Sequence, residues 1–299
     1  MDAGVSALER RYRWLLLAYP RGYRSGNGEE LVATLLDAAA PGRTSPSWRE
    51  AVALIVGGLR VRALDVAEGP AWADGLHLGV TVLSVANLAV LLPYATSIPW
   101  WVALSAITVF LVLRGRVRPA LPLVVLIASK MCAIVLGYPW LDQTLLPIFS
   151  DPIWHAPALY SGGGPVAPVA AYALVFLGLS VLAVRAAPLR RRTWRWWLAA
   201  PSLAVTDPAW LTVTAGSLRD LAGIGLEVAL LALAVWAGHA AADPRWGVAA
   251  GIGLLPAVVM FSENLSFYGR QELSHLGIIV LLTLVAAAVP IHARRHALL

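Results

Sequence analysis

Long apolar segments recur along most of this chain, and they restrict the folds open to it. A transmembrane helix needs about 20 mostly apolar residues. In lipid, every backbone polar group must be bonded within the protein, which leaves helices as the simplest spanning element. The sequence therefore predicts an all-α protein, with a polytopic transmembrane helix bundle over residues 69–299. Clear spans are expected at 75–93, 98–113, 119–138, 166–184, 218–239, 245–262 and 273–291.

The charge content agrees with this class. Only 13% of the 299 residues are charged, against about 25% in soluble domains. The net charge of +6 belongs mostly to the apolar part, because residues 1–70 hold 9 arginines against 8 acidic side chains. There the excess serves orientation and contact with anionic lipid head groups, so direct nucleic-acid binding is not expected.

Arginines in the loops predict how the bundle is oriented, because short cytoplasmic loops carry the basic residues. The segment 196–214 is apolar enough to span but contains Pro201, Asp207 and Pro208, so seven or eight spans are possible. With eight spans, 11 of the 13 arginines after residue 68 are cytoplasmic; with seven, 10 are. We expect eight, in a multi-pass protein of the cell membrane with both termini in the cytoplasm.

Residues 1–68 differ from the rest and predict a small cytoplasmic head of three amphipathic helices. The first should end at Tyr19-Pro20, because the residue before proline avoids the helical region. A turn is expected over Arg21–Asn27, followed by a second helix over Glu29–Ala39. The third begins with a capping box, Ser47 with Glu50 three residues on. On that helix one face is apolar, with Trp48, Val52, Ile55 and Leu59.

Several short runs in this head carry a resemblance. They are Tyr19-Pro20-Arg21-Gly22-Tyr23-Arg24, Gly28-Glu29-Glu30-Leu31 and Ser45-Pro46-Ser47-Trp48-Arg49-Glu50. In order and spacing the head resembles the HAAS-type signalling and permease-prefix domains of actinobacterial membrane proteins, which are often encoded beside PadR-type transcription regulators. The resemblance implies a docking or regulatory role for the head. The residues it points to are Tyr19, Pro20, Arg21, Tyr23, Arg24, Glu29, Glu30, Trp48 and Arg49.

Lys130 is the only lysine of the chain and lies inside an apolar run. A cation near mid-bilayer costs several kcal/mol unless it finds a partner or water. We hypothesise an intramembrane ion pair between Lys130 and Glu227, with Asp207 as the other possible partner. Such a pair either fixes helix packing or serves transport or gating. Alternatively, Lys130 extends its ammonium group to the membrane surface.

Small residues are a further packing signal. Gly247, Gly251 and Gly253 lie on one predicted span at spacings that favour close helix packing, within or between chains. They do not specify an oligomeric state.

Two functions follow as expectations. The first is an integral membrane regulatory or signalling protein, whose head (residues 1–68) docks a cytosolic partner such as a transcription regulator. The second is a permease, or the membrane subunit of an ABC-type exporter with a separate ATPase. The chain has no P-loop, HExxH or GxSxG motif and a single cysteine, Cys132. We therefore expect no enzymatic activity, no cofactor and no metal.

Overall fold

The computed structural model describes residues 7–40, 42–67, 69–137, 164–185, 189–205, 218–266 and 269–297. Within these ranges the regular elements are helices, so the predicted all-α class is confirmed for them. The chain forms two compact units, Met1–Gly69 and Pro70–Leu299. Each is described by itself.

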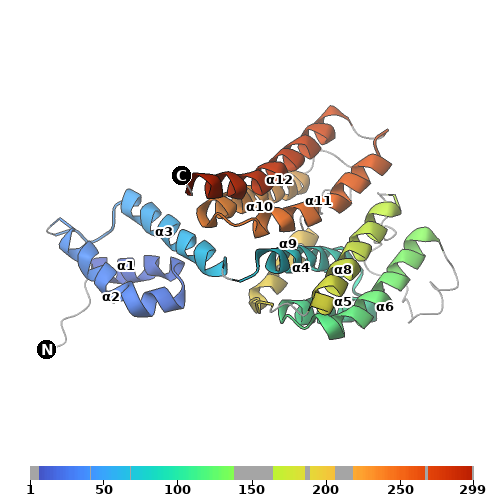
Figure 1. Ribbon diagram of the computed structural model, residues 1–299, viewed down its shortest axis with the longest axis horizontal. Coiled ribbons are helices and arrows are strands. Elements are labelled where there is room, and N and C mark those ends of the chain that lie inside the picture. Colours follow the sequence, from blue (N-terminus) through green and yellow to red (C-terminus); the bar gives the residue numbers. More distant parts are fainter. Residues whose placement is uncertain are drawn as a thin grey trace. The chain divides into compact units, whose positions relative to one another are not determined.

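The first unit consists of α1 (Ala7–Leu15), the short 3₁₀ helix η1 (Leu16–Ala18), α2 (Arg21–Asp37) and α3 (Trp48–Val66). The elements pack around an apolar core of their own (Figure 1). Tyr12 is 1% exposed at its centre, and the Tyr19 and Tyr23 rings stack 5.0 Å apart beside it. The buried members of this core are Leu8, Tyr12, Leu15, Leu16, Tyr19, Val32 and Leu54.

The predicted turn over Arg21–Asn27 is wrong, because these residues form the first turns of α2. Pro20 stands at the N-cap position, and its carbonyl accepts a hydrogen bond from the Arg24 N–H at 3.1 Å. Glycine, serine and asparagine are weak helix formers, but packing against the core outweighs such small preferences. The helical segment that precedes α2 ends at Tyr19-Pro20, as predicted from the sequence.

The predicted capping box at the start of α3 is confirmed. Ser47 Oγ accepts from the Glu50 N–H at 3.2 Å, and the Ser47 N–H donates to Glu50 Oε2 at 3.0 Å. The hydrogen bond from the Ser47 backbone, followed by those from Arg43, lowers the pKa of Glu50 to about 2. Tyr12 also donates to this carboxylate, at 3.0 Å, so the cap ties α3 to α1.

The second unit is the helix bundle. Within its described residues, six helices are long and apolar enough to cross a membrane, while α5 is shorter, with 15 residues. In chain order the elements are α4 (Ala71–Leu91), η2 (Leu92–Tyr94), α5 (Pro99–Leu113), α6 (Val117–Leu136), α8 (Val166–Arg185), η3 (Trp194–Leu198), α9 (Ala199–Val205), α10 (Leu218–Ala241), α11 (Arg245–Glu263) and α12 (Arg270–Ala297).

Helix α4 lies at the centre of this bundle. In its apolar window 78% of the residues are buried, the highest share among the six spanning candidates. It packs against α5, α8, α9 and α11, and its contact with α11 is the most extensive in the molecule. Helix α6 packs on α5 and α8, while α10, α11 and α12 lie side by side (Figure 1).

Hydrogen bonds define two ends of the bundle. At the Arg245 end, the Arg192 N–H donates to the carbonyl of Leu113, the last residue of α5, and the Arg192 side chain reaches Asp74 at the start of α4. At the Glu263 end, the Glu263 carboxylate accepts from the N–H groups of Val166 and Ala167, at 2.9 and 3.0 Å. A negative charge is favourable there, at the N-terminus of α8. Consecutive long helices thus alternate between the two ends.

The segment predicted as a doubtful eighth span, 196–214, is described only as far as residue 205. Its η3 and α9 enter the bundle beside Arg192. Ala200 is 1% exposed and belongs to a cluster with Val85 and Leu88 of α4. Farther along, α9 contacts η2, the element that follows α4. The segment therefore extends from the Arg245 end towards the other end.

A matched pair of glycine substitutions tests the packing of α11. A Cβ atom on Gly247 would lie 2.7 Å from Ala287 Cα and 2.8 Å from Ala286 O, whereas one on Gly251 would meet no atom within 4 Å. Gly247→Ala should therefore destabilise the bundle by about 1–3 kcal/mol, because the α12 backbone must move. Gly251→Ala should stabilise it by about 0.5–1 kcal/mol through helix propensity. Thermal unfolding of the detergent-solubilised protein measures both; equal shifts would contradict the packing.

Candidate functional site

Four charged side chains form a buried ionic cluster at the Arg245 end. We call Asp74, Arg192, Asp243 and Arg245 the Asp74 cluster. The two Asp74 oxygens take separate partners, Arg192 Nη2 at 3.0 Å and Arg245 Nη1 at 3.0 Å. The Arg245 guanidinium also grips Asp243, with Nε to Oδ1 at 2.9 Å and Nη2 to Oδ2 at 3.1 Å. The Arg245 backbone N–H also donates to Asp243 Oδ1.

The sequence folds locally so that these groups meet. Asp74 lies in the first turn of α4, where a carboxylate suits the helix dipole. Asp243 and Arg245 flank Pro244, the N-cap residue of α11. Arg192 lies in the connection between α8 and η3, fixed by its own N–H bond to Leu113. Three separate parts of the chain are thereby joined at one carboxylate.

The cluster is strongly desolvated yet balanced in charge, with two arginines and two aspartates. The Arg245 side chain is 0% exposed, and those of Arg192, Asp243 and Asp74 are 8, 8 and 9% exposed. Burial lowers the pKa of Arg192, which the Asp74 charge opposes. Because removing one member of a buried pair leaves an uncompensated charge, such a cluster is costly to disrupt.

His77 lies one turn beyond Asp74 on α4 and is fully buried. Its Nε2 lies 2.8 Å from the Val112 carbonyl oxygen of α5. A carbonyl only accepts, so Nε2 carries the proton in this contact. The histidine therefore fastens α4 to α5 beside the Asp74 cluster.

The Asp74 cluster was not predicted from the sequence, because most of its members are far apart along the chain. Asp74 and Arg245 are 171 residues apart in sequence. The one local signal is Asp243-Pro244-Arg245, where two opposite charges precede an apolar run. Arginines at span ends also suit membrane orientation and contact with anionic head groups, so their positions alone do not indicate an ion pair.

The intramembrane pair of Lys130 with Glu227 or Asp207 stays a prediction. Lys130 is 0% exposed on α6, among buried side chains that include Ile127 and Met131. Glu227 belongs to α10, and its Oε2 lies 3.4 Å from His275 Nε2 of α12, an ion pair only when the histidine is protonated. That histidine nitrogen lacks hydrogen-bond geometry, so the contact is a loose one. Among the described ion pairs none joins Lys130 to Glu227, and Asp207 lies outside the described residues.

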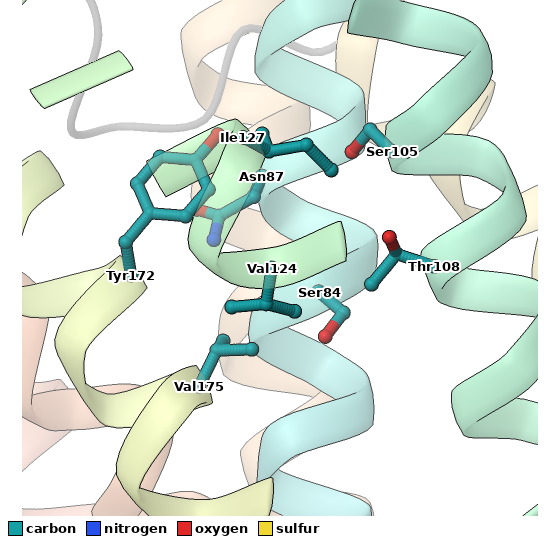
Figure 2. Close-up of a pocket in the computed structure, with 8 residues that line it drawn as sticks. All are labelled: Ser84, Asn87, Ser105, Thr108, Val124, Ile127, Tyr172 and Val175. Carbon is teal, nitrogen blue, oxygen red and sulfur yellow. The ribbon is translucent and has the colours of Figure 1, made fainter. Parts of the chain in front are cut away.

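A small cavity, lined by polar and apolar residues, lies between α4, α5, α6 and α8, and its lining residue Ile127 is one helical turn from Lys130. Figure 2 shows side chains of all four helices converging on it. Its volume is about 10 Å³, which is the size of a single water molecule. The Ser84 hydroxyl is buried there without a hydrogen-bond partner in the described structure. The lining residues are Ser84, Asn87, Ser105, Thr108, Val124, Ile127, Tyr172 and Val175.

The head residues indicated by the resemblance divide into two groups. Tyr19 is 7% exposed, stacks on Tyr23 and belongs to the core, and Pro20 caps α2. Others lie on the surface: Arg21 and Glu30 are exposed, and Glu29 forms an ion pair with Arg13 at 2.7 Å. The Trp48 ring is 72% exposed, with the Arg49 guanidinium 5.8 Å from its centroid. Arg24 is half-buried.

Comparisons with known proteins give this chain no relative. No protein-family profile, curated protein or solved structure matches it.

Loss of the shared carboxylate should destabilise the bundle. Asp74→Asn leaves Arg192 and Arg245 buried without that charge, so we expect a loss of about 3–5 kcal/mol. Glu29→Gln removes one partner of an exposed pair, with a Glu29 side chain 79% exposed, and should cost much less, because water screens exposed ion pairs. Hydrogen exchange of the backbone amides in α4 and α2, respectively, measures the two losses. Similar changes in both would contradict a structural role for the Asp74 cluster.

Proposed function

We propose that this chain is a multi-pass membrane protein of regulatory type, whose N-terminal unit docks a cytosolic partner such as a transcription regulator. The observation that supports it is the separate unit Met1–Gly69, with a core of its own. Its helix α2 exposes charged side chains, Arg21 and Glu30 among them, that the core does not use. Charged surface groups steer and specify association with a partner.

A second function, a permease or the membrane subunit of an exporter with a separate ATPase, is favoured by a different observation. Lys130 is fully buried in a spanning candidate, one helical turn from a residue that lines a small cavity between four helices. Ionisable residues inside membranes often mark substrate or ion pathways. The two functions differ in the partner that the protein recruits.

We further propose that the bundle crosses the bilayer eight times, with the head and the C-terminus in the cytoplasm. Support comes from η3 and α9, which extend along α4 from the Arg245 end. The arginine-rich turn at 114–118 would then face the cytoplasm and the α11–α12 turn the outside. With seven crossings, both turns would face the cytoplasm.

Cysteine labelling separates the two topologies. In a Cys132→Ser background, Ser266→Cys should react with a membrane-impermeant maleimide in intact cells, because eight crossings place it outside. Arg116→Cys should react only after the cells are permeabilised. Both positions are exposed in the structure, which makes them a matched pair. Labelling of both positions only after permeabilisation would favour seven crossings.

Crosslinked affinity purification of the full-length protein from its native membrane tests the partner. We expect a DNA-binding regulator in the eluate, and about a tenfold loss when Arg21→Glu and Glu30→Arg are combined, which swaps charges without changing the net charge. Arg116→Glu, an exposed change in the bundle, is the control and should recover the regulator normally. An ATPase in the eluate would favour the exporter. Equal recovery by a chain lacking residues 1–68 would exclude docking through the head.

A further inference from the structure

Helix α3 exposes an apolar row on the side that faces away from the core of the first unit. Buried Leu54 and Gly58 mark the inner side, whereas Ala63, which is also buried, lies on the outer side beyond the last stripe residue, near the C-terminal end of the helix. The outer residues recur at spacings of three and four along the helix, which places them on one face. We call this row the α3 stripe: Trp48, Val52, Ile55, Val56 and Leu59, which are 72, 47, 39, 46 and 39% exposed.

Basic side chains border the α3 stripe. By helical spacing, Arg49 and Arg60 lie along one edge and Arg62 along the other. The acidic residues of α3 point elsewhere: Glu50 is held by Ser47 and Tyr12, and Asp65 falls on the side of Leu54. An apolar strip with arginine edges is the pattern of a helix that lies in the surface of an anionic membrane.

The covalent chain keeps α3 near the bilayer. The helix ends at Val66, and the first spanning candidate begins at Ala71. With four residues between them, 67–70, the five Cα-to-Cα steps from Val66 to Ala71 reach at most about 18 Å when fully extended. The last turn of α3 is therefore held close to the head-group layer, which is about 5–8 Å thick on each side. Trp72, 47% exposed in the first turn of α4, is of the type that anchors a span at this layer.

We propose that α3 lies on the surface of an anionic bilayer, with the α3 stripe inserted at the boundary of head groups and acyl chains. Arg49 and Arg60 then contact lipid phosphates. This assigns Trp48 and Arg49 to lipid and leaves the charged surface of α2 for a protein partner. The proposal rests on the spanning helices of the bundle and is independent of which partner the head recruits.

Spin-label accessibility tests the inserted stripe. In the Cys132→Ser background, labels at Val52→Cys and Leu59→Cys are compared with one at Ala33→Cys, an exposed position of α2. The full-length protein is placed in nanodiscs of phosphatidylcholine with phosphatidylglycerol. Insertion predicts that both stripe labels collide with oxygen but not with a water-soluble nickel chelate, and that the Ala33 label collides with the chelate.

Two other outcomes would overturn the proposal. Stripe labels that collide freely with the nickel chelate would show that α3 faces water. Labels shielded from both reagents would show that protein covers the α3 stripe, from the bundle, a second copy or a partner.

The role of charge has its own control. Arg49→Gln combined with Arg60→Gln should reduce the ratio of inserted to detached stripe about fivefold for each arginine removed, in bilayers that contain phosphatidylglycerol. In pure phosphatidylcholine the same variant should behave like the parent chain. Arg21→Gln, on α2, should change neither. An equal loss in both bilayers would overturn the assignment of these arginines to anionic lipid.

Discussion

The Asp74 carboxylate binds two arginines from distant parts of the chain, and the arrangement of the bundle at this end depends on it. One arginine belongs to the connection after α8, the other to the start of α11. Each charge is almost free of water, so each depends on the others for its solvation. The central helix α4 is thereby fixed at its first turn. One turn farther on, His77 donates a hydrogen bond to a carbonyl oxygen of α5.

Close backbone approach completes this fixation. Gly75 and Gly79 of α4 face α11, and a Cβ on Gly75 would lie 2.9 Å from the carbonyl oxygen of Arg245. A Cβ on Gly79 would lie 2.7 Å from the side chain of Ile252. Small residues four apart let helices approach closely in membranes, where van der Waals packing and polar contacts replace the hydrophobic effect. The extensive α4–α11 contact thus combines two glycines with an ion pair at its end.

The first unit follows different rules, because its core is small and its outer surface is mixed. The core side chains Tyr12 and Tyr19 hold three helices together, while α3 contributes only its inner side. The outer side of α3 remains apolar, with basic edges. Exposing an apolar surface of this length to water is unfavourable. The proposed membrane contact of α3 and the proposed partner contact of α2 therefore use different faces of one unit.

The sequence by itself determined the elements whose signals are local. Apolar runs placed the seven clear helices to within a few residues, because the length and polarity of a segment decide whether it can span. The capping box of Ser47 and Glu50 determined the start of α3, because both of its partners lie in one turn and the signal is therefore local. The turn expected at Arg21–Asn27 failed because weak local preferences gave way to packing.

Only the tertiary structure decided which charges meet. Lys130 and Glu227 are the conspicuous ions inside apolar runs, and their pairing stays a prediction; in the described structure α6 packs mainly on α5 and α8, and α10 on α11 and α12. Asp74 and Arg245, which do form an ion pair, lie at span ends. Membrane orientation already explains an arginine at such a position, so the sequence does not indicate its structural role. Their pairing depends on α4 and α11 lying side by side. Small glycines allow the close backbone approach, but the spacing of Gly75 and Gly79 does not by itself specify α11 as the helix that packs on them.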